Sequence, residues 1–421
     1  MRNRRSFVKK SLIGSISFVN LPWVSRQMIH PYHLGDGQGV DYRLTLDVPT
    51  RLFDGRQCWV HPRAGIVPAA GQNGLRVVMT MNTLQLSGSD VFKGMYDLHT
   101  NDLGKSWTEP RVLTALAPRY ETHDGVERPV AASDFWPKYH RTTQTLLGIG
   151  HTIVYTPEWE VKHPRPRHTA YSVYNAQKNE WASWRKLRMP DQAKFASAGA
   201  GCVQRLDQDD GTILLPISFH PPQQNSQVTV LRCTFDGDTL HYQDQGNELG
   251  IDDDTRGLHE PSITHFHDKY FLTIRNDKVG FITTSQDGLH FDPIRPWTFD
   301  DGTELGNYNT QQHWVAHSDA LFLVYTRRGA NNDHIFRHRA PLFMAEVDPE
   351  RLCVIRETEL VLVPERGVRL VNFGVTEVSA NETWVTVSEW MQPSGVEKYG
   401  SDGSVYVARI HWDKPNRNFS S

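Results

Sequence analysis

The chain has 421 residues, in which 45 Lys and Arg oppose 48 Asp and Glu to give a formal net charge of −3. This near-balance argues against a nucleic-acid-binding protein and against a polybasic membrane-surface protein. No stretch reaches the roughly 18–20 consecutive apolar residues of a membrane-spanning helix, and the length suits either two or three ordinary domains or one large all-β ring.

The first residues have the pattern of an export signal. The basic stretch at residues 3–10 contains the pair Arg4-Arg5, with Phe7 two residues later, and a modest apolar run follows at 11–24. A charged segment before an apolar one is typical of secretory signals, and paired arginines favour the twin-arginine export route. We therefore expect residues 1–35 to be an export signal and linker, and the mature protein to be periplasmic or extracellular. The alternative is a basic helical tip with a chance arginine pair.

The cysteines give no sign of a metal site. Cys58, Cys202, Cys233 and Cys353 are widely scattered without metal-type spacing. Cys202 and Cys233 could pair on neighbouring strands, but the sequence favours buried free thiols. No His/Asp spacing is diagnostic of a metal site either, so we expect neither a metal nor a cofactor.

Short β-rich runs separated by tight turns repeat along the rest of the chain. Residues 42–48 alternate as a strand and are expected to close a ring against residues 404–412. The intervening sequence divides into six units, at 59–107, 133–184, 198–240, 259–292, 313–355 and 372–412. Unit ends fall roughly 50–75 residues apart, which is typical of propeller blades with insertions. The pattern predicts an all-β fold, a single six-bladed β-propeller over residues 36–415, with functional loops on one face.

Two polar insertions interrupt these units, at residues 114–129 and 299–312. Each is expected to be either a solvated loop or part of a substrate rim. The turn at 100–107, TNDLGKSW, is the full Thr-x-Asp-x-Gly-x-x-Trp form of the Asp-box turn. In this pattern the Asp and the hydroxyl cap the turn, Gly permits positive φ, and Trp packs between neighbouring sheets.

Taken with the order of the remaining motifs, this turn resembles those of the sialidase superfamily, in particular bacterial exo-α-sialidase-like proteins with Asp-box repeats. The similarity covers most of residues 55–390. It implies that Arg63, in HPRAGIVP at 61–68, is the first carboxylate-binding arginine. It also implies that Asp90, in SGSD at 87–90, is the acid/base aspartate.

The resemblance continues through the later units. The Gly-rich stretch at 198–204 looks like the start of the family's third blade, and Glu260-Pro261 with Arg275 looks like its Glu-Pro segment and second arginine. Arg339 is implied as the third arginine, with Arg337 as the competing choice. The family uses a tyrosine nucleophile, activated by Glu, just before the last blade. Here residues 371–376 read VNFGVT, and Phe373 has no hydroxyl with which to attack carbon.

The same residues indicate an acidic-glycan site on physical grounds. Guanidinium groups bind carboxylate or sulfate bidentately, and their mutual repulsion makes a cluster costly without an anion. Alternatively, Arg275 or Arg339 could pair with Glu260 or Glu389 as a bridge between blades. Asp90 and Glu260 could form a glycosidase pair, one protonating the leaving oxygen and the other activating a water, which needs no tyrosine. The structural alternative for Asp90 is a capped turn.

A second constellation favours a different reaction. Tyr139, His140 and His151 lie in one unit, on either side of a hairpin, and His313-Trp314 begin another unit. A uronate lyase needs arginine to neutralise the substrate carboxylate and His or Tyr to remove the C5 proton. Each histidine could instead be a loop or inter-blade hydrogen-bonding group. We therefore predict a glycoside hydrolase acting on an acidic oligo- or polysaccharide, with a propeller lyase and a non-catalytic glycan-binding propeller as alternatives.

Overall fold

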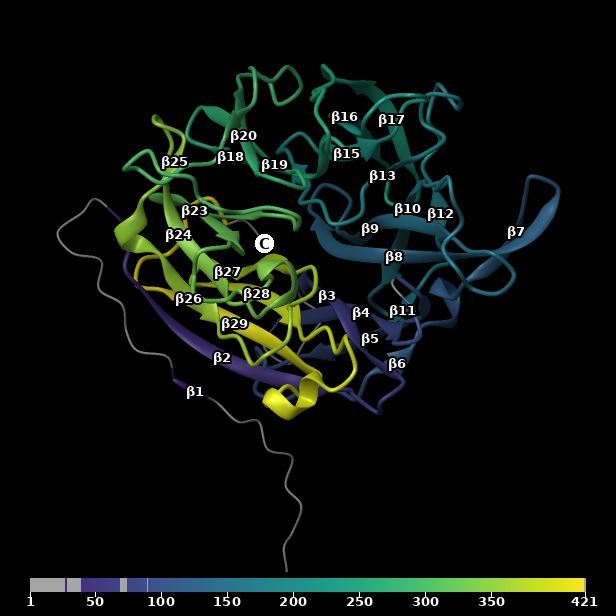
Figure 1. Cartoon of the computed structure of the whole chain (residues 1–421), viewed down its shortest axis with the longest axis horizontal. Coiled ribbons are helices and arrows are strands. Elements are labelled where there is room, and N and C mark those ends of the chain that lie inside the picture. The colour runs from purple at the N-terminus through teal and green to yellow at the C-terminus, as the bar shows by residue number, and fades with distance from the viewer. Residues whose placement is uncertain (1–26, 29–38, 69–73, 89, 420–421) are drawn as a thin grey trace, which may run out of the picture.

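The computed structural model describes residues 27–28, 39–68, 74–88 and 90–419. Six sheets stand around a common centre, as Figure 1 shows in a view down the shortest axis. The prediction of an all-β, six-bladed β-propeller is confirmed. Within the described ranges no helix is long and apolar enough to span a membrane. Apart from residues 27–28, the predicted export signal at 1–35 lies outside the described residues.

The first three sheets follow one another along the chain. The first sheet consists of β3 (Gln57–Pro68), β4 (Leu75–Gln85), β5 (Phe92–Thr100) and β6 (Arg111–Val112). The second consists of β7 (Arg119–His123), β8 (Val126–His140), β9 (Thr145–Val154), β10 (Thr169–Asn175), β11 (Glu180–Trp181) and β12 (Arg185–Lys186). The third consists of β13 (Ala198–Gly199), β14 (Leu206–Asp207), β15 (Ile213–Phe219), β16 (Gln227–Phe235) and β17 (Leu240–Gln245).

The remaining three sheets complete the ring. The fourth consists of β18 (His259–Phe266), β19 (Lys269–Arg275), β20 (Phe281–Ser285) and β21 (Arg295–Pro296). The fifth consists of β22 (His313–His317), β23 (Ala320–Tyr325), β24 (Leu342–Asp348), β25 (Cys353–Val354) and β26 (Leu360–Val363). The sixth consists of β1 (Gln27–Met28), β2 (Tyr42–Arg51), β27 (Gly374–Ser379), β28 (Glu382–Ser388) and β29 (Ser404–Trp412). Four 3-10 turns connect strands: η1 (Thr114–Leu116), η2 (Phe336–His338), η3 (Arg356–Thr358) and η4 (Val396–Tyr399).

The ring is closed by the two ends of the described chain. Strand β2 pairs antiparallel with β29, from Tyr42 opposite Trp412 to Arg51 opposite Ser404. The predicted closure of residues 42–48 against 404–412 is therefore confirmed. Because β2 comes from the N-terminal side and β27–β29 from the C-terminal side, the sixth sheet joins both ends of the propeller.

Six clusters of buried apolar side chains fill the spaces between neighbouring sheets. Because most sheets are covered by a neighbour on each face, their middle strands are apolar on both sides rather than alternating; the six residues of β23, ALFLVY, are all buried. All four cysteines are buried and free, as the sequence favoured.

The turn at 100–107 has the predicted capping bonds. The Gly104 N–H donates to Thr100 Oγ1 (2.9 Å), and the Ser106 N–H donates to Asp102 Oδ1 (2.9 Å). Gly104 has φ of +76°, and the Trp107 ring lies 5.8 Å from Trp384 of the sixth sheet. The turn thus links the first sheet to its neighbour.

One insertion differs from its expectation. Residues 114–129, expected to be a solvated loop or a substrate rim, form η1 and the β7–β8 hairpin, which projects outward from the ring (Figure 1). The turn is Asp124-Gly125, both at positive φ, which is a strong hairpin signal in a sequence. Residues 114–129 themselves contribute no side chain to the cavities described below.

Candidate active site

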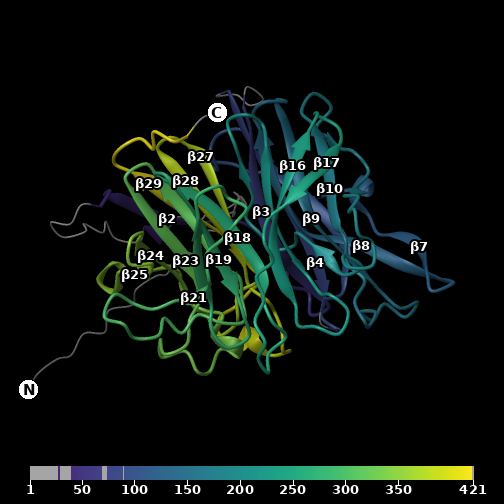
Figure 2. The same cartoon turned by 90° about the horizontal axis from the view of Figure 1, so that it is seen from above.

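Backbone distortions at the inner ends of the blades position the candidate site. Register shifts interrupt β3 between Val60 and Arg63, β8 between Ser133 and Trp136, and β18 between His259 and Ser262. Figure 2 shows the ring edge-on, with β3 and β18 running from one face towards the other. Bulges re-aim side chains and recur beside functional sites.

Four residues at these inner positions have left-handed backbone conformations: His61, Asp134, Cys202 and Glu260, with φ between +48° and +60°. Non-glycine residues occupy this region only when the surrounding structure compensates, and such residues cluster at active sites. All four line one cavity of about 440 Å³. Four blades therefore aim one equivalent side chain each into the same space.

This cavity also brings together most of the charged residues that the sequence singled out. Asp90, Glu260 and His151 line it, as do the three arginines Arg275, Arg337 and Arg339. Seven arginines of the described chain line it: Arg165, Arg167, Arg256, Arg275, Arg337, Arg339 and Arg369. Among the described residues, three carboxylates line it: Asp90, Asp134 and Glu260. The excess of fixed positive charge favours an anionic ligand.

Asp134 is the centre of a buried charged network. Arg63 Nη2 donates to Asp134 Oδ1 (3.2 Å), and the Asn372 amide donates to the same oxygen (3.4 Å). His61 Nδ1 lies 3.4 Å and His151 Nε2 3.9 Å from the carboxylate. Burial alone would raise the pKa of the Asp134 carboxyl, but His61, Arg63 and His151 outweigh it and hold the pKa well below its usual range. Asp134 is therefore a fixed negative charge in the wall of the cavity.

Glu260 is held by Arg275, which Asn309 links to Arg339. Arg275 Nη1 lies 2.5 Å from Glu260 Oε1, and Arg275 Nη2 donates to Asn309 Oδ1 (2.8 Å). Arg339 Nη2 donates to the Asn309 carbonyl (2.7 Å). Burial and then the charge of Arg275 lower the pKa of Arg339 to about 9. Asn309 belongs to the insertion at 299–312, which therefore supports the arginines from behind rather than lining the cavity.

Asp90 enters the cavity from the loop between β4 and β5. Its backbone is left-handed, with φ of +61°, and the buried Tyr155 hydroxyl donates to its carbonyl (2.9 Å). Arg165 Nη2 lies 3.1 Å from Asp90 Oδ2. The side chain of Asp90 is 28% exposed, more than Asp134 at 4%, so Asp90 can reach a ligand that enters from solvent.

The histidines of the site are neutral. Burial, reinforced by Arg167, lowers the pKa of His151 to about 3. Burial, reinforced by Arg275 and Arg256, also places the pKa of His259 well below its usual range. His151 packs against Gly201, where an added Cβ would lie 2.2 Å from Nδ1. The ring therefore occupies space that only glycine leaves open.

Several polar atoms at the cavity have no hydrogen-bond partner among the described residues. They are Nε2 of His61, Nε2 of His259, Oε2 of Glu260 and Nε of Arg275. Buried polar groups are normally paired, so a cluster of unsatisfied ones at a cavity marks the place where a ligand or water supplies the partners.

The structure places five of the predicted residues outside this cavity. Arg63 is fully buried beneath it, paired to Asp134, and does not line it. His140 bonds to Thr143 Oγ1 (2.8 Å) and the Gly211 carbonyl (3.0 Å). The other three are Tyr139 and Trp314, which line a second cavity, and His313, which bonds to Ser262 Oγ (2.8 Å). These five residues lie in blades that contribute to the cavity, but strand pleating and their depth along the propeller axis keep their side chains out of it.

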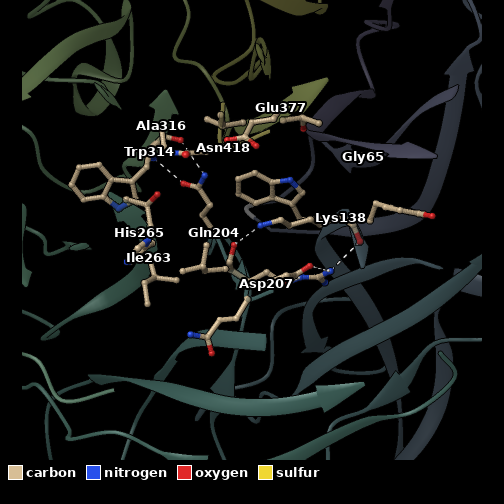
Figure 3. Close-up of a pocket in the computed structure, with 18 of the residues that line it drawn as sticks. Gly65, Lys138, Gln204, Asp207, Ile263, His265, Trp314, Ala316, Glu377 and Asn418 are labelled. Carbon is tan, nitrogen blue, oxygen red and sulfur yellow. Dashed lines mark hydrogen bonds and ion pairs between the residues drawn. The ribbon is translucent and has the colours of Figure 1, made fainter. Parts of the chain in front are cut away.

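The second cavity, of about 940 Å³, lies at the opposite ends of the inner strands. Figure 3 shows Trp314 and Lys138 on opposite sides of this cavity, and Glu377 and Asp207 on its upper and lower sides in this view. Its charged lining residues are four basic and four acidic: Lys138, Arg141, Arg205, Arg417, Asp207, Asp209, Asp210 and Glu377. Although this cavity is larger, its balanced charge and its lack of Asp90 and Glu260 make the smaller one the candidate active site.

A layer of side chains separates the two cavities. Arg63 stacks 4.9 Å over Trp136, whose ring lies 4.9 Å from His313, and His313 lies 4.9 Å from Phe373. Arg63 and Phe373 line neither cavity. In the chain, Arg63 within β3 and Phe373 just before β27 each lie between a residue that lines the smaller cavity and a residue that lines the larger one. Phe373 therefore fills the axis and is not presented to a ligand.

Sequence reasoning missed several lining residues. The polar and aromatic residues that were not predicted include His61, Asp134, Arg165, Arg167, Cys202, Arg256, His259, Arg369, Asn372 and Trp390. One available signal was the repeated pattern of a polar residue followed by proline and an inner strand, in His61-Pro62 and Glu260-Pro261. The arginines that were missed lie in loops between strands, where no hydrophobic periodicity of the sequence marks them.

Comparisons with known proteins give the fold and no close relative. No protein-family model and no curated protein matches the chain. A protein of unknown function from Dyadobacter fermentans has a similar structure, with TM-score 0.59, 13% identity, and coverage of 87% of this chain and 97% of that one.

Two sialidases are also similar in structure. The NanB sialidase of Streptococcus pneumoniae has TM-score 0.57 and 11% identity, covering 86% of this chain and 70% of its own. The sialidase of Trypanosoma rangeli has TM-score 0.54 and 10% identity, covering 84% of this chain and 55% of its own. At these identities the similarity shows a sialidase-like propeller fold.

Proposed function

We propose that this protein is a glycoside hydrolase that acts on an acidic glycan in the arginine-lined cavity. The observation that carries the proposal is the set of seven arginines facing three carboxylates at the inner ends of the blades. Guanidinium groups bind planar oxyanions bidentately, so this lining suits an acidic sugar better than a neutral one. The structural similarity to sialidases supports the same class of substrate.

In the proposed reaction Asp90 protonates the leaving oxygen and Glu260 activates a water. Glu260 suits the base role because Arg275 holds its Oε1 atom at 2.5 Å, while its Oε2 atom has no hydrogen-bond partner among the described residues and can accept from a water. Asp90 is paired with Arg165 in the free protein. A substrate anion that binds Arg165 would compete with Asp90 for that guanidinium, which would free Asp90 to carry the proton.

The cavity favours direct attack by water over a covalent intermediate. Among the described residues that line it there is no tyrosine, and Phe373 is buried in the axial layer. An exo-α-sialidase mechanism with a tyrosine nucleophile therefore has no support at this position. Direct attack by water predicts inversion at the anomeric carbon.

Hydrolysis is tested by incubating the purified protein with sialylated and uronate-containing glycans and measuring the release of reducing sugar. The variants D90N and E260Q are expected to lower the rate by about 10²–10⁴-fold. Asp209, 97% exposed at the opposite cavity, provides the control D209N, which is expected to retain activity. Full activity in D90N would refute the assignment of the acid.

A uronate lyase is the second candidate, and the neutral His151 favours it. Its lowered pKa leaves an unprotonated ring beside arginines that would neutralise a substrate carboxylate. Of the residues first considered for this reaction, His140 and Tyr139 lie outside the cavity, so His151 is the remaining base. A product with the ultraviolet absorbance of an unsaturated uronate, without hydrolysis, would identify the lyase. Glycan binding that survives in D90N and E260Q, with no substrate ever cleaved, would instead identify a binding protein.

We also propose that residues 1–35 direct export through the twin-arginine route. The supporting observation is the pair Arg4-Arg5 before an apolar run. In cell fractionation, the double variant R4K/R5K is expected to accumulate as an uncleaved precursor inside the cell. Equal export of the variant and the natural sequence would argue for another route.

A further inference from the structure

The arginines of the candidate active site fall into a buried group and a rim group. Arg275 and Arg339 are 7% and 5% exposed and meet at Asn309. Arg369 is half-buried and Arg337 is exposed, so this second pair lies nearer the mouth of the cavity. The two pairs therefore lie at different depths.

Aromatic rings hold the rim pair in place. The guanidinium carbons of Arg337 and Arg369 lie 5.1 and 4.7 Å from the centroid of the same Phe336 ring. Arg369 also stacks on Trp390 at 4.1 Å. Stacking uses the faces of the guanidinium groups and leaves their N–H edges available for an oxyanion.

The backbone that carries Arg337 is held in an unfavourable conformation. Arg337 and the following His338 both have left-handed φ values, +58° and +50°. Two hydrogen bonds hold this turn, one between His338 Nδ1 and the Tyr308 hydroxyl (2.5 Å) and one in which His338 Nε2 donates to Asp333 Oδ1 (3.2 Å). Such strain persists where it positions a functional group, and here it aims Arg337 over the cavity.

The rim pair has no negative partner in the described part of the chain. No carboxylate forms an ion pair with Arg337 or Arg369, whereas Arg165, Arg256 and Arg275 are each paired. Burial and then the charge of Arg337 lower the pKa of Arg369 to about 10, as expected for neighbouring cations without an anion. A bound anion would relieve this repulsion.

We infer that the cavity contains two separate anion subsites, a deep one at Arg275 and Arg339 and a second at the rim between Arg337 and Arg369. The inference rests on the proposed function and specifies its substrate class. The preferred glycan carries a second anionic group, a sulfate ester, in addition to the sugar carboxylate that enters the deep subsite. Sulfate suits the rim because its oxygens accept from two guanidinium edges at once.

The test is calorimetric binding of the purified full chain to defined disaccharides. The probes are a uronate-terminated disaccharide, each of its monosulfated regioisomers, and a disaccharide with two uronates. The variants are R337Q, R369Q and R339Q, with R295Q on the exposed outer strand β21 as the control. Binding is measured with active protein at low temperature, or with E260Q if the probe is cleaved.

At least one monosulfated probe is expected to bind about tenfold or more tightly than the unsulfated one, since a charge-assisted contact is worth that factor. R337Q and R369Q are expected to erase this preference, R339Q to weaken all acidic probes, and R295Q to change nothing. Equal affinity for all probes, or equal losses on every probe in R337Q, would overturn the inference. A preference for the disaccharide with two uronates over every sulfated probe would overturn the assignment of sulfate.

The outcomes separate this inference from the proposed function. Cleavage of an acidic glycan without a preference for a second charge would leave hydrolysis standing and reject the rim subsite. Tight, selective binding of a sulfated probe that is never cleaved would keep the rim subsite and reject hydrolysis.

Discussion

Asp134 determines the charge at the base of the candidate active site. It is the carboxylate that hydrogen-bonds to Arg63, which is fully buried, and it also accepts from Asn372. Removing one partner of a buried ion pair leaves the other charge uncompensated, which costs more than the pair itself contributes. Asp134 therefore has a structural role that Asp90, in a partly exposed loop, does not share.

The variant D134N is expected to lower the free energy of unfolding by roughly 3–5 kcal/mol, because Arg63 loses its counter-charge. The matched variant D90N, also Asp to Asn in the same cavity, is expected to change stability by less than about 0.5 kcal/mol while lowering the rate by about 10²–10⁴-fold. Urea denaturation of both variants measures the difference. Similar stabilities would show that Arg63 is neutralised by another group.

At the scale of the strands, close packing positions His151. A Cβ at Gly201 would lie 2.2 Å from His151 Nδ1, and one at Gly199 would lie 2.8 Å from its Cβ. The variant G201A is expected to displace the ring, lowering stability by about 1–3 kcal/mol and reducing activity.

Gly250 provides the matched control for G201A, because its added Cβ would meet only the Gln227 side chain at 3.2 Å. Activity assays and denaturation of G201A and G250A measure the effect. If G201A kept full activity at normal stability, the position of His151 would not matter to the reaction.

The six units and the ring closure were predictable because turn chemistry and apolar runs are local features of the sequence. The β7–β8 hairpin was also marked locally, by Asp124-Gly125, but was taken for a loop or a rim. Cavity depth was not predictable, because it depends on the bulges that rotate His61, Asp134 and Glu260 into left-handed conformations. Arg63 shows the consequence: its motif was visible, while its burial beneath the cavity was not.

Closure of the sixth sheet makes its outer strand essential. Truncation before residue 52 removes β2 and exposes the edge of β29, together with the apolar surface that Leu44, Leu46 and Tyr42 cover. The shortened protein is expected to aggregate or to unfold at a much lower temperature. Truncation before residue 27 keeps β1 and β2 and is the control. Size-exclusion chromatography and thermal melting distinguish them, and a monomeric, stable shorter form would show that the ring closes without β2.

For the whole molecule, the two ends of the axis differ in charge although the net charge is only −3. The candidate active site has an excess of arginine, while the second cavity is balanced. A local field of this kind attracts anions to one face and weakens as salt is added. The propeller therefore concentrates on one face a charge that composition alone conceals.

The buried histidines of this interior are expected to lower the stability of the protein at acidic pH. Burial lowers the pKa values of His61, His151, His259 and His313, that of His151 to about 3. In the unfolded chain histidine titrates near about 6.5, so between that pH and about 3 the unfolded state binds protons that the folded state does not. Stability is therefore expected to fall as pH decreases from about 6.5, by up to roughly 1.4 kcal/mol per pH unit for each such histidine.

Carboxylates such as Asp277, whose pKa is lowered to about 2 because Arg256 outweighs burial, act in a more acidic window. Their contribution is present above the unfolded pKa near about 3.9 and is lost as pH falls towards 2, so the histidines dominate between pH 6.5 and 4.5. Urea denaturation at several pH values in this range measures the slope of the free energy of unfolding against pH. The variant H151Q is expected to reduce this slope by the contribution of one histidine. A stability that stays constant down to pH 4.5, or a slope that H151Q leaves unchanged, would mean that these rings become protonated without unfolding the propeller.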